Sequence, residues 1–382
     1  MRCYFKLLTW SITMMMMFTQ CREKYIPKVD PSNTRLLVIE GFINSGQGPT
    51  TIHLSRTTDL QDTAYTPEPG AQLNVEGNDG NSFALYENTN GEYSIPQLTM
   101  NNNVKYRLHI RTVDGKEYAS DYSSVQYTPS IDSITWQIEN GGVRIYVNTH
   151  NDQNDTGYYR WTYSETWEFH SRFFKMCSYI IDPSTGMAIG VICGPDPDTT
   201  IYKCWTTQNS TNIILGSSER LTADRIYLPI RYVEPQSEEL TVLYYIHLKQ
   251  YALSKDAYRF YQGLKKNTEQ IGSLFDPQPS KVVGNVHCIN DPGQTAIGYV
   301  EISQAQEKDI FIHNSDLPVI WTSQIPCSEF LLKNKPPLNT TFIPTRVGEL
   351  GPYNSIVSYY ATDPICVDCT LRGTNIKPSF WP

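Results

Sequence analysis

Few side chains of this 382-residue protein are charged, and its positive charges form no run. Asp, Glu, Lys and Arg make up 18% of the residues, against about 25% in a typical globular protein. The formal net charge is −8. An acidic chain without a basic run is poorly suited to bind the phosphates of nucleic acids or of lipid headgroups. We therefore expect no nucleic-acid partner.

The sequence also lacks the motifs of common catalytic and cofactor sites. It has no nucleophile elbow, zinc-protease motif or phosphate loop, and Gly46-Gln47-Gly48 lacks the third glycine of a dinucleotide loop. The seven histidines are scattered, so no histidine metal site and no cofactor are expected. These absences favour a non-enzymatic protein. A glycosidase needs only two carboxylates that meet in space, so the sequence leaves that function open as the least favoured.

Long apolar runs are absent after the first twenty residues. The run Leu7–Phe18 follows the positively charged Arg2 and Lys6. It is shorter than the roughly 20 apolar residues of a membrane span, and this order of charge and apolar run is typical of a signal peptide. We expect residues 1–20 to be removed.

Cys21 follows the apolar run at the position where bacterial lipoproteins are cleaved and acylated. We predict that Cys21 is lipidated and that its acyl chains are the membrane attachment. An ordinary cleaved signal, with Cys21 as a structural cysteine, is the alternative. Residues 21–34 are polar, contain Pro27 and Pro31, and are predicted to form a tether.

Aromatic residues are abundant: the chain has 26 Tyr, and Phe, Trp and Tyr make up 12% of it. Tyrosine-rich surfaces suit binding, because one end of the side chain is apolar and the other polar. We expect Tyr159, Trp161 and Trp167 to pack inside the protein and part of the remaining tyrosines to line a surface.

Residues 35–128 consist of short β-type runs separated by turn signals such as Asn78-Asp79-Gly80. This length and pattern predict an immunoglobulin-like β-sandwich. Residues 129–382 are predicted to form a larger β-rich domain with one amphipathic helix. That helix is expected over Ser254–Thr268, with Ser254 as the N-cap and Gly272 as the stop.

A long strand is predicted from Tyr158 to Phe169, because aromatic residues alternate with polar ones. Glu165 is the one carboxylate on the aromatic face. Burial would raise its pKa, as the general acid of a glycosidase requires. A bulge that turns Glu165 outward, or a buried pair with an arginine, is the favoured interpretation.

Seven cysteines remain after Cys3 and Cys21, and disulfides are the default for an extracytoplasmic chain. An odd number leaves at least one unpaired. Cys366 and Cys369 are spaced for a tight disulfide, half of a zinc site with Cys327, or a redox pair, and we favour the disulfide. A bridge among Cys177, Cys193 and Cys204 would close a loop rich in Gly, Pro and Asp. The disulfide candidates are Cys177, Cys193, Cys204, Cys288, Cys327, Cys366 and Cys369.

Two oxygen-rich segments, Asn151–Gly157 and Asp196-Pro197-Asp198, have side chains that could bind calcium. Neither matches the register of an EF-hand loop. Asx-rich turns between strands are commoner, so we interpret both as turns and predict no metal site.

Many short motifs follow one another along the chain in a recognisable order. They are Cys21 with Tyr25-Ile26-Pro27, Leu37–Ile43, His53–Thr57, Ile131-Asp132-Ser133, Tyr159-Arg160-Trp161, Gln250-Tyr251, Ala257-Tyr258, Gly272–Ser280, Gly284-Asn285-Val286, Cys366–Cys369 and Phe380-Trp381. This order resembles the Bacteroidota lipoproteins grouped as domain of unknown function 4249, and the resemblance covers essentially the whole chain after residue 20. It implies an outer-membrane lipoprotein, often associated with TonB-dependent transporters, and supplies no catalytic residues.

The sequence therefore favours a surface-exposed outer-membrane lipoprotein that breaks no bond. We expect it to bind a ligand or to act as an accessory to a TonB-dependent transporter in nutrient uptake. A stand-alone adhesion or structural lipoprotein of the cell surface is the alternative, and an extracellular glycosidase or peptidase is the least favoured. The ligand-binding residues stay unassigned at this stage.

Overall fold

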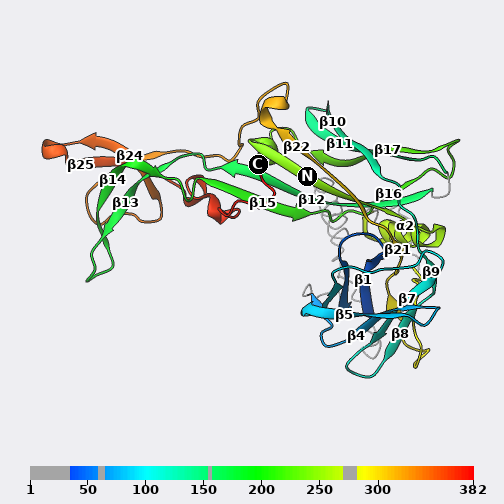
Figure 1. The fold of residues 1–382 in the computed structure, drawn as a ribbon. Helices are drawn as coiled ribbons and strands as arrows, with labels where there is room; N and C mark the ends of the chain where they lie inside the picture. Colours follow the sequence, from blue (N-terminus) through cyan, green and yellow to red (C-terminus); the bar gives the residue numbers. More distant parts are fainter. Residues whose placement is uncertain (1–34, 59–64, 154–156, 270–281) are drawn as a thin grey trace, which may run out of the picture.

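The computed structural model describes residues 35–58, 65–153, 157–269 and 282–382, where the chain is mainly β. Its strands form an N-terminal sandwich, a central sandwich and a distal arm that projects from the central sandwich (Figure 1). The mainly β fold expected from the sequence is confirmed. The expected signal peptide and tether lie outside the described residues. Among the helices described, none combines the length and apolar character that a membrane span requires.

The N-terminal sandwich folds around one core of aliphatic and tyrosine side chains, among them Leu54, Val75 and Tyr93. Its hydrogen-bonded strand order is β19-β8-β7-β4-β5-β6-β2-β1-β20. The strands are β1 (Leu37–Asn44), β2 (Thr50–Arg56), β3 (Thr66–Pro67), β4 (Gln72–Gly77), β5 (Ser82–Thr89), β6 (Glu92–Ile95), β7 (Lys105–Arg111), β8 (Glu117–Ser120), β9 (Ser123–Ser124), β19 (Val286–Cys288), β20 (Ala296–Ile297) and β21 (Ile302–Ser303).

Three of these strands come from a distant part of the sequence. Strands β20 and β21 pair in parallel with β1, and β19 pairs antiparallel with β8. The boundary expected between residues 35–128 and 129–382 therefore needs correction, because residues 286–303 complete the N-terminal sheet. Strands of two or three residues are too short to show an alternating pattern, so this pairing could not be predicted from the sequence.

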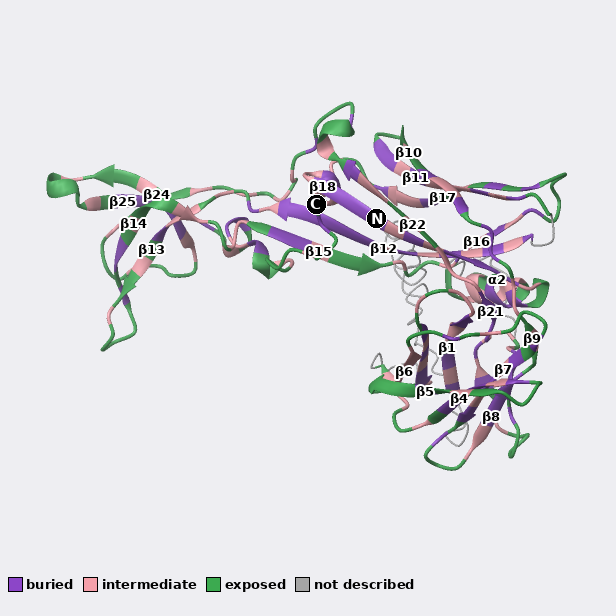
Figure 2. Ribbon diagram, viewed as in Figure 1, coloured by how far each residue is buried: buried purple, intermediate pink, exposed green. Residues whose placement is uncertain are grey.

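The central sandwich has two facing sheets, β10-β11-β17 and β15-β12-β18-β22, with β16 paired to β12. The expected aromatic face of β12 is buried between them. Tyr159 and Trp161 are fully buried and Trp167 nearly so, which confirms their predicted core role (Figure 2). The strands are β10 (Ile131–Glu139), β11 (Gly142–Asn151), β12 (Tyr158–His170), β15 (Lys203–Asn209), β16 (Ile214–Ser217), β17 (Asp224–Val233), β18 (Leu243–Ala252) and β22 (Gln306–His313).

One α-helix is present in the described part of the chain, α2 (Lys255–Glu269). The Ser254 hydroxyl accepts a hydrogen bond from the Ala257 N–H at 3.2 Å, as expected for its N-cap. Ala257, Phe260 and Tyr261 are buried against the central sandwich. The expected stop, Gly272, lies outside the described residues. The short 3₁₀ turns are η2 (Glu238–Leu240), η3 (Asn314–Asp316), η4 (Pro352–Asn354), η5 (Pro364–Cys366) and η6 (Cys369–Leu371).

The distal arm is a small two-layer unit that the sequence analysis did not separate from the rest of the second domain. A two-stranded sheet, β13-β14, packs on a three-stranded sheet, β23-β25-β24. The fully or nearly fully buried residues of its core are few, namely Cys177, Val191, Tyr359 and Ala361. Its strands are β13 (Lys175–Ile181), β14 (Ala188–Asp198), β23 (Phe330–Lys333), β24 (Ile343–Leu350) and β25 (Ile356–Thr362).

Candidate functional site

The expected lipidation site, Cys21, lies outside the described residues, but all seven disulfide candidates are described. Six of them form three disulfides, Cys177–Cys193, Cys204–Cys369 and Cys327–Cys366. The first closes the Gly- and Pro-rich hairpin between β13 and β14. Cys288 is the free cysteine, and it is buried in the N-terminal sandwich.

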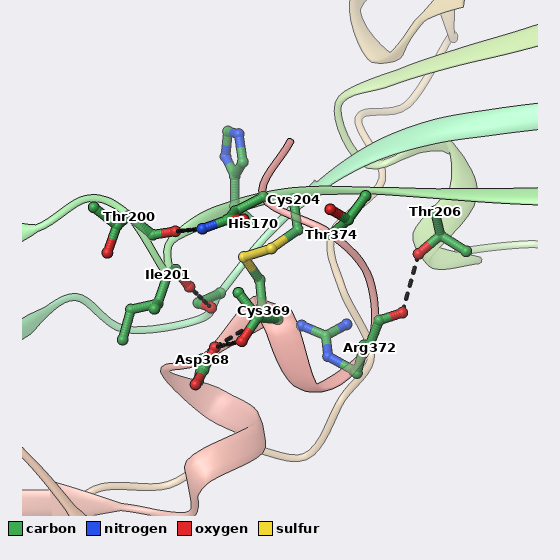
Figure 3. The surroundings of a disulfide bond; sticks show 12 residues. His170, Thr200, Ile201, Cys204, Thr206, Asp368, Cys369, Arg372 and Thr374 are labelled. Atoms are coloured by element: carbon green, nitrogen blue, oxygen red, sulfur yellow. Dashed lines mark hydrogen bonds between the residues drawn. A yellow bond between two sulfur atoms is a disulfide. The ribbon is translucent and has the colours of Figure 1, made fainter. Parts of the chain in front are cut away.

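Cys366 and Cys369 do not bond to each other, which corrects the favoured interpretation of their spacing. They lie in successive turns, η5 and η6, and each bonds to a different segment of the chain. Figure 3 shows Cys369 bonded to Cys204 of β15. The Cys369 N–H donates to the Ile201 carbonyl at 2.8 Å. The Thr206 hydroxyl donates to the Arg372 carbonyl at 3.0 Å (Figure 3). The pair therefore fastens the C-terminal segment to the central sandwich and to the arm.

Glu165, the one carboxylate on the aromatic face of β12, is buried and fully engaged. Its Oε2 accepts hydrogen bonds from Arg231 Nε at 2.8 Å and from the Tyr244 hydroxyl at 2.6 Å. Burial opposes the charge of Arg231, but the hydrogen bond and charge of Glu165 outweigh burial and raise the pKa of Arg231. Glu165 therefore forms a buried pair with an arginine, which is one of the two interpretations that the sequence favoured over a general acid. Its role is to join the two sheets.

The described residues of the two oxygen-rich segments belong to no cluster of metal-binding side chains. Asp198 accepts hydrogen bonds from the Thr200 N–H and hydroxyl, as in an ordinary turn, and lies 3.9 Å from Lys175. Residues 154–156 of the other segment are not described. Across the described ranges, no three His, Cys, Asp or Glu side chains are grouped to hold a metal ion.

A cleft of about 460 Å³ lies between α2 and the central sandwich. The start of β12, the loop after β16 and the exposed face of α2 form its walls. Two tyrosine rings contact each other there at a tilt of 42°, with the centroids of Tyr158 and Tyr258 5.0 Å apart. The Nζ of Lys255 lies 6.0 Å from the centroid of the Tyr158 ring. The lining residues are Tyr158, Ser217, Glu219, Arg220, Lys255, Tyr258, Arg259 and Gln262.

The lining of this α2 cleft is positively charged, although the chain is acidic. Lys255, Arg220 and Arg259 outnumber the single acid, Glu219. Lys255 and Glu219 form an ion pair, which raises the pKa of Lys255 and lowers that of Glu219. Arg259 contacts Asp256 at 3.4 Å on the rim and keeps an exposed guanidinium. A ligand in the α2 cleft would therefore meet ring faces, amide and hydroxyl groups and a net positive charge.

Two other clefts differ from the α2 cleft in charge. The one on the opposite side of α2, of about 440 Å³, adds Asp121 and Asp256 around the shared Arg259. A larger one, of about 800 Å³, lies in the N-terminal sandwich. There Glu68 and Asp114 offset two of the three basic side chains, Arg35, Arg56 and Lys116. The α2 cleft has the larger excess of positive charge and is the candidate site.

Sequence reasoning found only part of the α2 cleft. It placed Tyr258 and Lys255 on the expected helix, but it had no means to bring Glu219 and Arg220 beside them. Arg220 follows β16, which pairs with the start of β12, and α2 follows β18 on the other side of β12. The pairing of three strands therefore creates the cleft. The only part of the sequence that indicated the cleft was the helix, whose exposed face carries two basic residues and a tyrosine.

These features define a β protein of several units with a small cationic cleft and no metal cluster within the described ranges. Residues 22–309 match the family described as Domain of unknown function (DUF4249), and the chain belongs to that family. The match includes α2 and the hairpin β13-β14, whereas β23, β24 and β25 of the arm lie beyond it. No curated protein matches the chain significantly.

Solved structures resemble the chain only remotely. Trypsin-activated alpha-2-macroglobulin from Escherichia coli is 12% identical with a TM-score of 0.20, and the alignment covers 61% of this chain. The chain spans only 15% of that protein's length. The B domain of a biofilm associated protein is 7% identical with a TM-score of 0.17, over 76% of this chain and 89% of that domain. Likenesses this low carry no argument about function.

Proposed function

We propose that this protein is a non-enzymatic lipoprotein of the outer membrane, exposed at the cell surface, that binds an acidic, hydroxylated ligand. The α2 cleft carries the proposal. In a chain with a net charge of −8, three basic side chains and two tyrosine rings gather around one acid. Tyrosine rings stack on the apolar faces of sugars, and guanidinium groups bind carboxylates. A saccharide that carries carboxylates fits both features.

The membrane part of the proposal is supported by the sequence. Acyl chains on Cys21 would hold the protein at the membrane, and the tether 21–34 would leave the described units free to meet ligands. Within this role the protein would serve as an accessory that supplies its ligand to a TonB-dependent transporter. Three disulfides support an oxidising compartment.

The ligand class can be tested by isothermal titration calorimetry on the lipidated protein in a non-ionic detergent. We expect trigalacturonate to bind, with an affinity that falls as salt rises, and the neutral maltotriose to give no heat. Arg259→Gln should weaken trigalacturonate at least tenfold, about 1.4 kcal/mol. The matched control is Arg111→Gln in the N-terminal sandwich, because the two arginine side chains are 64% and 60% exposed. Equal affinity in both variants would refute the α2 cleft.

The stand-alone adhesion lipoprotein stays a second candidate, because the distal arm exposes many apolar side chains. Purification from native outer membranes in mild detergent separates the two. A near-stoichiometric transporter supports the accessory role. Recovery of the lipoprotein alone, together with binding to cell-wall or host polymers, supports adhesion.

A further inference from the structure

The distal arm combines a small core with disulfide bonds. Cys177–Cys193 joins the two strands of the hairpin β13-β14, and Cys327–Cys366 closes the base of the three-stranded sheet. Cys204–Cys369 fastens the segment that follows β25 to β15. Two of the three disulfides of the described chain therefore lie in the arm or at its base, whereas Cys204–Cys369 lies in the core of the central sandwich. Units with small cores depend on such bonds.

The end of the hairpin β13-β14, residues 178–192, exposes apolar side chains on both of its faces. Neighbouring strand residues point to opposite faces, and Ile180 and Ile181 are 42% and 48% exposed. Ile189 and Ile192 of β14 are more exposed than either, and Met187 beside the turn is 68% exposed. Figure 2 shows exposed residues around the turn of the hairpin, and buried ones such as Val191 where β14 meets the arm core. Two-stranded hairpins are marginally stable in water, and apolar patches of this kind mark interaction sites.

The same segment is nearly free of charge. Between residues 176 and 195 the only charged side chain is Asp182, in a chain with a net charge of −8. Its Oδ1 accepts hydrogen bonds from the Ser184 N–H and hydroxyl at 2.8 and 2.7 Å, so the acid shapes the turn at the tip. Depletion of charge with enrichment of large apolar residues is typical of the centre of a protein interface.

We infer that the end of this hairpin inserts into an apolar, uncharged cleft of an integral membrane protein that lies beside the anchored chain. Apolar side chains on both faces of the hairpin are buried together only if the partner contacts both faces. A cleft makes both contacts, whereas a flat surface makes one. Asp182 at the tip disfavours entry into the hydrocarbon of a bilayer, because a carboxylate is costly there. A cleft that is open at its far end leaves this acid in water. The inference rests on the proposed attachment to the outer membrane and adds the surface that meets the partner.

Site-specific photocrosslinking in the cells that produce the full lipidated chain tests the inference. The photoreactive residue p-benzoylphenylalanine replaces Met187 or Ile189 in the hairpin, or Tyr227 on the exposed face of the central sandwich as the control. We expect light to join positions 187 and 189 to one and the same integral membrane protein, identified by mass spectrometry. Position 227 should give no such adduct.

Substitutions in the hairpin then test whether its apolar side chains hold the partner. Ile181→Ser with Ile192→Ser should lower the adduct at position 187 at least tenfold, and valine at both positions should restore it. Ile320→Ser, at an isoleucine outside the arm that is more exposed than either of these, should leave the adduct unchanged. Mapping of Cys177–Cys193 in each variant shows that the hairpin has formed.

Three outcomes would overturn the inference: an adduct between two copies of this chain, an adduct with lipid only, or no adduct at either hairpin position. Fractionation and trigalacturonate titration of the same strains separate this failure from that of the proposed function. If the chain is in the outer membrane and binds trigalacturonate but its hairpin meets no protein, only the role of the arm is refuted. A chain that is absent from the membrane refutes the proposed function itself.

Discussion

Arg231 and Glu165 form a buried ion pair that joins the two sheets of the central sandwich, with Nε and Oε2 2.8 Å apart. Arg231 comes from β17 and Glu165 from β12. The same guanidinium donates from Nη2 to Glu239 at 2.7 Å. The network thus uses Glu165 for packing, and it explains why a carboxylate occurs on an otherwise aromatic strand face.

Removal of one partner of this pair should destabilise the protein strongly. We expect Arg231→Met to lower the free energy of unfolding by about 3 kcal/mol, because it leaves Glu165 buried with only Tyr244 as a partner. Adding Glu165→Leu should recover most of the loss. Urea unfolding followed by tryptophan fluorescence measures both. Binding of trigalacturonate should be unchanged in the double variant, and a loss of binding there would contradict a purely structural role.

The cysteines should give one defined peptide map under non-reducing conditions. We expect Cys366 linked to Cys327 and Cys369 linked to Cys204, with no bond between Cys366 and Cys369. Cys288 should react with a maleimide only after unfolding, since it is buried. Replacing both Cys204 and Cys369 by serine should cost about 4 kcal/mol of stability, because the bond closes a long loop. A linked Cys366–Cys369 peptide would contradict the fold of the C-terminal segment.

Glu301 should make stability depend on pH in the opposite sense to an ordinary acid. It lies just before β21, and its Oε2 accepts hydrogen bonds from the Ser254 N–H and hydroxyl at 3.2 and 2.6 Å. Burial raises its pKa above the usual 4.5. A raised carboxyl pKa adds stability that is complete below the unfolded value and is lost as pH rises through the folded one.

Glu301→Gln should therefore raise the melting temperature relative to the parent at pH 8, and this advantage should vanish at pH 4. Thermal unfolding by circular dichroism at several pH values measures the difference. The control is Glu349→Gln at an exposed position in the arm, which should show no such trend. An advantage that grows as pH falls would contradict the assigned direction.

Lipidation should depend on Cys21 alone. We expect Cys21→Ala to move the protein from the membrane fraction to the soluble fraction and to abolish labelling by an alkyne-tagged palmitate. The hairpin variant Ile181→Ser with Ile192→Ser should stay in the membrane fraction, because its acyl chains are intact. A Cys21→Ala chain that still partitions with the membrane would contradict the lipid anchor.

Several features of the fold could be predicted because they depend on neighbouring residues. The alternation of Tyr159, Trp161 and Trp167 indicated which face of β12 is buried, and the structure confirms it. Ser254 indicated the start of α2 in the same local way, through the hydrogen bond of an N-cap. The pattern that predicts lipidation of Cys21 is local too, and it stays a prediction because those residues are not described.

By itself, the sequence determined the β character and the buried face of β12, which follow from a spacing of two residues, and the start of α2, which follows from the local hydrogen bond of its N-cap. Only the tertiary structure decided which partner each group meets. It joined Cys369 to Cys204, paired Glu165 with Arg231, returned residues 286–303 to the first sheet and brought Arg220 beside α2. Such pairings join segments far apart in the chain, and they are decided by the packing of whole sheets rather than by any local pattern.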